Sequence, residues 1–234
     1  MAQTNVNSRE LFAAIDKGDY GTFEALLERG ANVNGREADT GRTPLIAALE
    51  AKRAVFVRTL LEKGARVETR DAGGRTPLHA AVEQDDVALA RLLLSHRAIP
   101  DAADDAGLTP LMEAAAAGSD RMVGALLTGR PTLNRRDHAG MTALMLAVTA
   151  PEEGAATVLR LLAKAGADVN AGRTGDGMTA LMLAARAGRT DSARALLALG
   201  ADPKRTARNN QTALRLARAR RSPELIALLD GARR

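Results

Sequence analysis

Residues 74–82 read Gly-Arg-Thr-Pro-Leu-His-Ala-Ala-Val, and this short segment is the strongest indication of the fold. Asp71 and Gly74 mark a tight turn, because both residue types favour turn conformations. Thr76 can cap a helix by accepting a backbone N–H, and Pro77 suits the first helical position, where its missing N–H is not needed. The stretch therefore predicts a turn that leads directly into a short helix.

The same pattern recurs along the chain at a nearly constant interval. The steps between successive Thr-Pro-Leu or Thr-Ala-Leu triplets are 33, 33, 33, 37 and 33 residues. The triplets begin at Thr43, Thr76, Thr109, Thr142, Thr179 and Thr212. A Leu-Leu pair such as Leu126-Leu127 follows about seventeen residues later in most units and indicates a second apolar helix. A lone helix pair of this kind cannot bury its apolar faces, so the units are expected to stack.

These units resemble ankyrin repeats. The G-x-T-P-L-H-x-A-A pattern stands at Gly74 to Val82, with Val82 in place of the last Ala, and the closing G-A-D-V-N pattern stands at Gly166 to Asn170. The resemblance covers roughly residues 8–230. It implies an all-α fold, a right-handed ankyrin-repeat solenoid of helix-turn-helix units joined by β-hairpin-like loops.

The repeat phase also predicts the domain organisation. We expect a single ankyrin-repeat domain over residues 1–234, with an N-terminal capping repeat at 8–40, internal repeats at 41–73, 74–106, 107–139, 140–176 and 177–209, and a C-terminal capping repeat at 210–234. Phe12, Tyr20 and Phe23 are expected to thicken the core of the first repeat.

Two departures from the pattern predict local differences. Arg97 and Arg130 stand where other units have Gly at the end of the second helix, so we expect altered or looser helix ends there. The 37-residue step holds four extra residues. Three of them fit best as Pro151-Glu152-Glu153 between two helices, and the fourth near Arg173 in the following loop.

Composition and motifs argue against catalysis. The chain has no Cys, which removes disulfides, thiol chemistry and every zinc site that uses Cys. The three histidines, His79, His96 and His138, fall at different phases of the repeat and in no metal motif. The resemblance implies a structural hydrogen bond for His79. No nucleophile elbow or phosphate-binding loop is found, so we expect a non-enzymatic protein with no cofactor and no metal.

The positive charge is concentrated near the C-terminus. The net charge is +5, but residues 204–234 hold nine Lys or Arg against Glu224 and Asp230, which gives +7 there and leaves −2 on residues 1–203. This segment is either a soluble end surface that covers the last apolar face, or a contact for an acidic partner, a nucleic acid or an anionic surface.

The resemblance places partner contacts on the hairpin tips and on the exposed face of the first helices. The residue before each repeat threonine runs Arg42, Arg75, Leu108, Met141, Met178, Gln211. The residue seven positions after each threonine runs Glu50, Glu83, Ala116, Thr149, Arg186, Ala219. We expect Leu108, Met141 and Met178 to form an exposed apolar contact, and ordinary isolated surface residues are the alternative.

The candidate contact set takes five residues from the first row and three from the second, and adds two loop residues. Its members are Arg42, Arg75, Asp105, Leu108, Ala116, His138, Met141, Thr149, Met178 and Arg186. A second methionine run, Met112, Met145 and Met182, is expected to pack between neighbouring first helices.

Two classes of function remain open. The first is a non-enzymatic protein–protein interaction module that binds through the hairpin tips and the concave helical face, with a stoichiometric inhibitor or an immunity-type protein as its specific form. The second is an adaptor that binds nucleic acid or an anionic surface through the Arg-rich C-terminal repeat. Aromatic residues make up only 2% of the chain, which disfavours binding of single-stranded nucleic acid, because its bases stack on exposed aromatic rings.

The sequence also bounds the state and location of the protein. A monomer is expected, and no run of about 18 apolar residues predicts a membrane span. Met1 to Glu10 is polar and is no secretory signal, so the sequence as written predicts a cytoplasmic protein. A periplasmic or secreted location is the alternative if a signal peptide was removed before Ala2-Gln3.

Overall fold

The computed structural model describes the backbone of residues 2–232 and the side chains of residues 9–232. Arg233 and Arg234, which contribute to the C-terminal charge, and Met1 lie outside the described residues. The described chain is helical and contains no strand. It divides into two compact units, Met1–Asp105 and Ala106–Arg234. Across residues 2–232, every helix is too short or too polar to cross a membrane.

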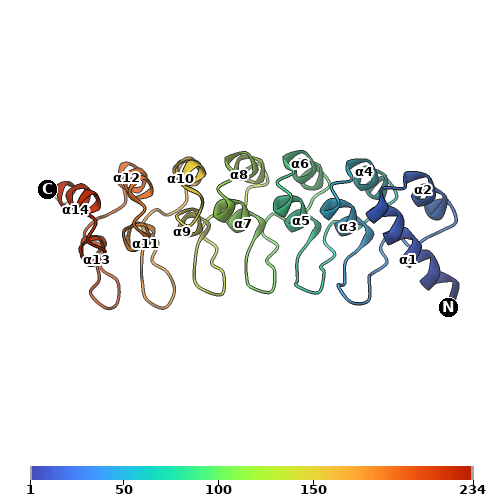
Figure 1. The fold of residues 1–234 in the computed structure, drawn as a ribbon, viewed down its shortest axis with the longest axis horizontal. Coiled ribbons are helices and arrows are strands. Elements are labelled where there is room, and N and C mark those ends of the chain that lie inside the picture. Colours follow the sequence, from blue (N-terminus) through green and yellow to red (C-terminus); the bar gives the residue numbers. More distant parts are fainter. Residues whose placement is uncertain (1, 233–234) are drawn as a thin grey trace. The chain divides into compact units, whose positions relative to one another are not determined.

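The first unit consists of three helix pairs. Its inner layer is α1 (Ala2–Lys17), α3 (Pro44–Glu50) and α5 (Pro77–Glu83). Its outer layer is α2 (Tyr20–Glu28), α4 (Ala54–Glu62) and α6 (Val87–Ser95). Each inner helix packs against the outer helix that follows it, and α3 packs against both α1 and α5 (Figure 1). The rings of Tyr20, Phe23 and Phe56 cluster, with the Phe23 and Phe56 centroids 4.6 Å apart.

The second unit repeats this arrangement with four pairs. Its inner helices are α7 (Pro110–Ala117), α9 (Ala143–Ala147), α11 (Ala180–Ala187) and α13 (Ala213–Ala219). Its outer helices are α8 (Asp120–Leu127), α10 (Glu152–Ala165), α12 (Thr190–Ala198) and α14 (Pro223–Gly231). Successive helices pack within each layer, and the hairpin-like loops extend beside the inner layer (Figure 1). The expected all-α fold of helix-turn-helix units is confirmed.

The six repeat threonines start the inner helices. Each is the N-cap residue with an extended backbone, as at Thr142, whose Oγ1 accepts a hydrogen bond from the Met145 N–H at 3.3 Å. In one repeat the backbone N–H of Thr76 donates to Nδ1 of His79 at 3.1 Å. His79 is fully buried, so the structural role expected for it is confirmed.

Small and flexible side chains fill the space between inner helices. Met112, Met145 and Met182 are no more than 1% exposed, which confirms their expected packing position. Leu126 is fully buried as its repeat phase predicts. Leu127, the second residue of the same pair, is only half-buried and lies at the edge of the core.

Single backbone hydrogen bonds join neighbouring hairpin tips within each unit. In the first unit the Ala72 N–H donates to the Thr40 carbonyl oxygen at 2.8 Å, and the Asp105 N–H donates to that of Gly73 at 3.0 Å. In the second unit His138 donates in the same way to Ala106 at 3.0 Å. These bonds fix the spacing of the loops that carry the candidate contact residues.

The two arginines in place of glycine behave differently from each other. Arg97 has a φ of 65°, and Ala98 donates its N–H to the Leu93 carbonyl at 3.0 Å, the same closure that other helix ends use. The expected alteration at Arg97 was therefore wrong, because Arg97 adopts the left-handed conformation. Arg130 also has a positive φ of 55°, but Pro131 follows and has no N–H to close the helix end.

The extra residues of the long repeat lie partly in a helix. Pro151 is the N-cap of α10, and Glu152 and Glu153 form the first turn of that 14-residue helix. The expectation that all three residues connect two helices was wrong, because acidic side chains are favourable in a first helical turn and extend the helix. The fourth extra residue lies where it was expected, in the loop closed by the Arg173 N–H and the Met178 carbonyl at 2.8 Å.

Candidate protein-binding surface

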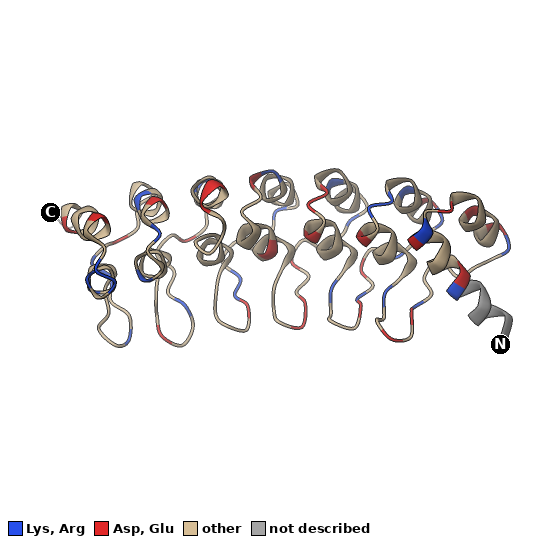
Figure 2. Ribbon diagram, in the orientation of Figure 1, with Lys and Arg blue, Asp and Glu red and all other residues tan. Residues whose placement is uncertain are grey.

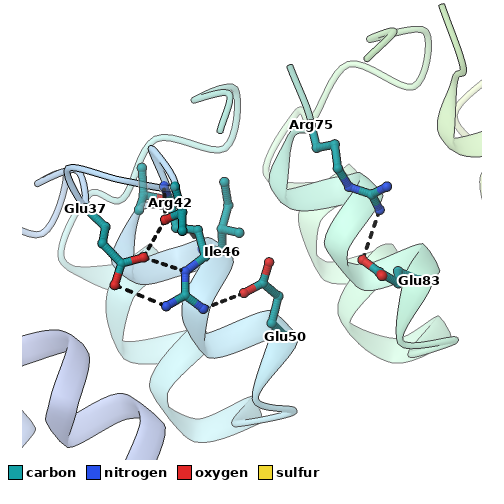
Figure 3. Close-up of polar contacts among 8 residues, drawn as sticks. Glu37, Arg42, Ile46, Glu50, Arg75 and Glu83 are labelled. Atoms are coloured by element: carbon teal, nitrogen blue, oxygen red, sulfur yellow. Dashed lines mark hydrogen bonds and ion pairs between the residues drawn. The ribbon is translucent and has the colours of Figure 1, made fainter. Parts of the chain in front are cut away.

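The row of residues before the repeat threonines contacts the row along the inner helices within single repeats. The residue before the repeat threonine folds over the residue eight positions further on. Arg42 Nη1 lies 2.7 Å from Glu50 Oε2, and Arg75 Nη2 lies 3.1 Å from Glu83 Oε2 (Figure 3). The tip and the inner helix therefore form one continuous surface.

Arg42 is held in place by carboxylates on both sides. Its Nε donates to Glu37 Oε2 at 2.9 Å, opposite the contact with Glu50 (Figure 3). The hydrogen bond with Glu37 raises the pKa of Arg42 above its ordinary value. The same bond, helped by the Thr40 hydroxyl, lowers the pKa of Glu37. Arg42 and Arg75 are half-buried, so they present oriented and largely compensated charges to solvent.

The expectation of exposed methionine tips was wrong. Met141 is 9% exposed and Met178 is 6% exposed. Both occupy the position of Arg42, so their side chains lie over the inner helix of their own repeat and lose contact with water. Met178 Sδ lies 3.6 Å from Arg186 Nη1, the residue eight positions further on. These methionines support the surface from beneath.

The remaining candidate residues differ in exposure. Those whose side chains are exposed are Asp105, His138, Thr149 and Arg186. Leu108 and Ala116 are half-buried. In the second unit, the exposed candidate residues are therefore polar to basic, with Thr149 in the turn after α9, Arg186 on α11 and His138 on a hairpin tip.

An ion pair missed by the sequence analysis stabilises one hairpin of this surface. Arg173 Nε donates to Asp176 Oδ1 at 3.0 Å, and the Met178 N–H donates to the same oxygen at 3.1 Å. The bond from Arg173 lowers the pKa of Asp176 from 3.8 to about 2. The signal available in the sequence was the pair of opposite charges three residues apart in a loop with an inserted residue.

The Arg42–Glu50 and Arg75–Glu83 pairs were also missed as pairs. Both glutamates stood in the row read along the inner helices, but they were left out of the contact set. The repeated spacing of eight residues between opposite charges was the available signal. Among the described side chains, no group of three or more His, Asp or Glu lies close enough together to hold a metal ion.

Comparison with known proteins places this architecture in a family. A sequence model described as "Ankyrin repeats (3 copies)" matches residues 11–104, 98–173 and 150–232. The chain therefore belongs to the ankyrin-repeat family. A solved crystal structure, that of the ankyrin repeat domain of Bcl-3, a member of the IkappaB protein family, is similar with a TM-score of 0.81 and 27% identity. The similarity covers 95% of this chain and 98% of the Bcl-3 chain.

Two curated proteins share a shorter segment. The chain is 41% identical over 64 residues to the 2-5A-dependent ribonuclease of Mus musculus. It is 39% identical over 64 residues to the ADP-ribosylation factor GTPase-activating protein AGD2 of Arabidopsis thaliana. Each match covers 27% of this chain but only 9% and 8%, respectively, of those longer proteins. Ankyrin repeats mediate protein–protein interaction and are generally non-enzymatic, which indicates a protein partner for this chain.

Proposed function

We propose that the chain binds a protein partner through its hairpin tips and inner helices and acts by occupying that partner, as a stoichiometric inhibitor or an immunity-type protein does. The surface comprises the ten candidate residues, with the exposed members making the contacts. Met141 and Met178 act by supporting the surface from beneath.

One observation carries this proposal: one buried position keeps the same residue in every repeat, while a neighbouring row that is exposed or half-buried varies. The residue two positions after each repeat threonine is Leu in all six repeats, and each such Leu is buried. Five positions further on, the row changes from Glu50 and Glu83 through Ala116 and Thr149 to Arg186. A constant scaffold with a varied surface row presents different chemistry at each step, which suits selective recognition of a protein surface.

A capture experiment with a matched control tests the proposal. The variant Ala116→Arg/Thr149→Arg adds bulk and charge on α7 and in the turn that follows α9, both in the second unit. The control Ala165→Arg/Ala227→Arg adds the same groups at exposed positions on the outer helices α10 and α14. Each immobilised protein is incubated with native lysate, and the retained proteins are identified by mass spectrometry.

We expect that the parent and the control retain at least one stoichiometric partner and that the Ala116→Arg/Thr149→Arg variant loses it. Truncations near the centre of such a contact should reduce the affinity more than truncations at its rim, because water is excluded at the centre. An identical set of retained proteins for all three chains would contradict the assignment of this surface.

A further inference from the structure

The last hairpin and α13 carry a dense positive charge. Residues 203–221 include seven Lys or Arg and no Asp or Glu, and all seven basic side chains are exposed. We call these seven side chains the basic C-terminal surface. Figure 2 shows basic residues in blue on α13 and no acidic residue on that helix.

Three of these seven side chains are oriented by backbone carbonyl groups, which do not compensate their charge. Arg215 Nη1 donates to the Asn210 carbonyl oxygen at 2.8 Å, and Arg205 Nη2 donates to that of Asn170 at 3.1 Å. Arg220 Nη1 lies 3.4 Å from the Arg186 carbonyl oxygen. A backbone carbonyl fixes a guanidinium group without neutralising it, and each guanidinium keeps further N–H donors for a ligand.

Nearby carboxylates are already engaged with other groups. Asp230 lies 3.6 Å from Arg218, which is part of the surface, while Glu224 lies 3.2 Å from Arg194 on α12. Asp176 pairs with Arg173, and Asp202 accepts a hydrogen bond from the Lys204 backbone N–H at 2.8 Å. Only Arg218 among the seven therefore has a carboxylate partner within the described part of the chain.

The lack of carboxylate partners is specific to the C-terminal end, as a comparison with the first unit shows. There, Arg42 and Arg75 lie at the tips of the hairpins and each has a glutamate of its own repeat as a partner. The last repeat has Gln211 and Ala219 at the corresponding two positions, and of its arginines only Arg218 has a carboxylate partner, Asp230.

We propose that the basic C-terminal surface binds an Asp/Glu-rich segment of the protein partner. This inference rests on the proposed function, because it names the chemistry of that partner. Guanidinium groups match carboxylates in shape and can donate two parallel hydrogen bonds to each. Phe12, Tyr20, Phe23 and Phe56 all lie in the first unit, so the second unit offers no Phe, Tyr or Trp ring on which the bases of a single strand could stack.

A binding assay with defined probes tests this assignment. The full chain is titrated into a fluorescein-labelled poly-glutamate peptide at about 50 mM salt, and binding is followed by fluorescence anisotropy. A peptide with Gln in place of each Glu and a DNA duplex of equal total charge are measured in parallel. The variant Lys204→Gln/Arg208→Gln/Arg215→Gln removes three exposed charges from the last hairpin and α13.

A second variant controls for net charge. Arg91→Gln/Arg121→Gln/Arg160→Gln removes three exposed positive charges from the outer helices α6, α8 and α10. We expect the surface variant to lose about tenfold in affinity for poly-glutamate, whereas the control stays near the parent. Affinity should also fall as salt rises to about 200 mM, and the Gln peptide should not bind.

Three results would overturn the inference. The first is no binding of poly-glutamate at low salt, and the second is an equal loss of affinity in both variants. The third is tighter binding of the DNA duplex than of poly-glutamate, which would assign the surface to nucleic acid. Loss of a lysate partner upon Ala116→Arg/Thr149→Arg, together with no poly-glutamate binding, would leave the proposed function standing and remove only this inference.

Discussion

Met141 and Met178 occupy the same position in consecutive repeats but have different neighbours. The residue eight positions further on is Thr149 in one repeat and Arg186 in the other, where the guanidinium lies 3.6 Å from the Met178 sulfur. We expect Met141→Asp to lower the free energy of unfolding by about 2–4 kcal/mol, because it places a carboxylate in a largely buried position without a cationic partner.

The same substitution at Met178 should cost at least about 1 kcal/mol less, because Arg186 can pair with the new carboxylate. Urea denaturation of both variants, with Met141→Leu as the volume-conserving control, measures the difference. Equal losses in the two Asp variants would show that Arg186 does not reach position 178. Parent-like stability of both would contradict the burial of these side chains.

The Arg173–Asp176 pair makes stability depend on pH in a defined direction. The pKa of Asp176 is about 2 in the folded protein, below its ordinary value of 3.8, so the unfolded chain binds the proton more readily. The stabilisation is therefore present above about pH 4 and is lost as the pH falls through about 2.

Asp176→Asn tests this dependence. Parent and variant should differ in free energy of unfolding at about pH 5–7 and converge near pH 2, as measured by urea titrations across that range. Asp191→Asn is the control, because Asp191 is exposed and lies 4.0 Å from Arg194. A difference between parent and Asp176→Asn that is the same at both ends of the pH range would exclude the ion pair as its cause.

At the scale of elements, an asparagine ties each of two repeats to the next one. Asn170 Nδ2 donates to the Gly200 carbonyl at 3.1 Å, and its Oδ1 accepts from the Asp202 N–H at 2.8 Å. Asn34 makes the same two bonds in the first unit, with Gly64 and Arg66. One asparagine side chain thus provides a hydrogen-bond partner both for a carbonyl group at a helix end and for an N–H group of the following loop.

Removal of the two hydrogen bonds made by the Asn170 side chain should destabilise the second unit. Asn170→Ala is expected to lower the free energy of unfolding by about 1–3 kcal/mol, because a donor and an acceptor of the backbone both lose their partner. Asn170→Asp keeps the acceptor and should fall between Ala and the parent. Circular dichroism during urea unfolding measures the series, and an Asp variant as unstable as the Ala variant would contradict the role of the Oδ1 acceptor.

The sequence predicts elements well where one residue type determines the local structure. Thr76 and Pro77 can start a helix only in one register, so the six caps locate the inner helices. The end of an insertion is harder to predict, because Glu152 is compatible with both a connection and a first helical turn. In the structure Glu152 lies in the first turn of α10, and Pro151 is the N-cap residue.

Across the whole molecule, position in the repeat was easier to predict than exposure. The repeat phase placed Arg42, Arg75 and Met178 in one row, and the structure confirms that row. The repeat phase did not predict that these side chains fold over their own inner helix, because burial at a hairpin tip depends on side-chain rotamers and on the residue that faces the tip. The ion pairs of Arg42 and the burial of Met178 follow from that contact between two segments of the same repeat.

Neighbouring repeats of an array share one core, so the stability of the array depends on residues that contact two helices at once. Leu126 and Leu127 are adjacent in α8, but only Leu126 is fully buried, whereas Leu127 lies half-buried at the edge. Leu126→Ala should lower the free energy of unfolding by about 2–5 kcal/mol, since it leaves a cavity between helices of the second unit. Leu127→Ala removes the same atoms from a partly hydrated position and should cost about 1 kcal/mol or less. Urea denaturation followed by circular dichroism measures both, and equal losses in the two variants would mean that the repeat phase assigned to α8 is wrong.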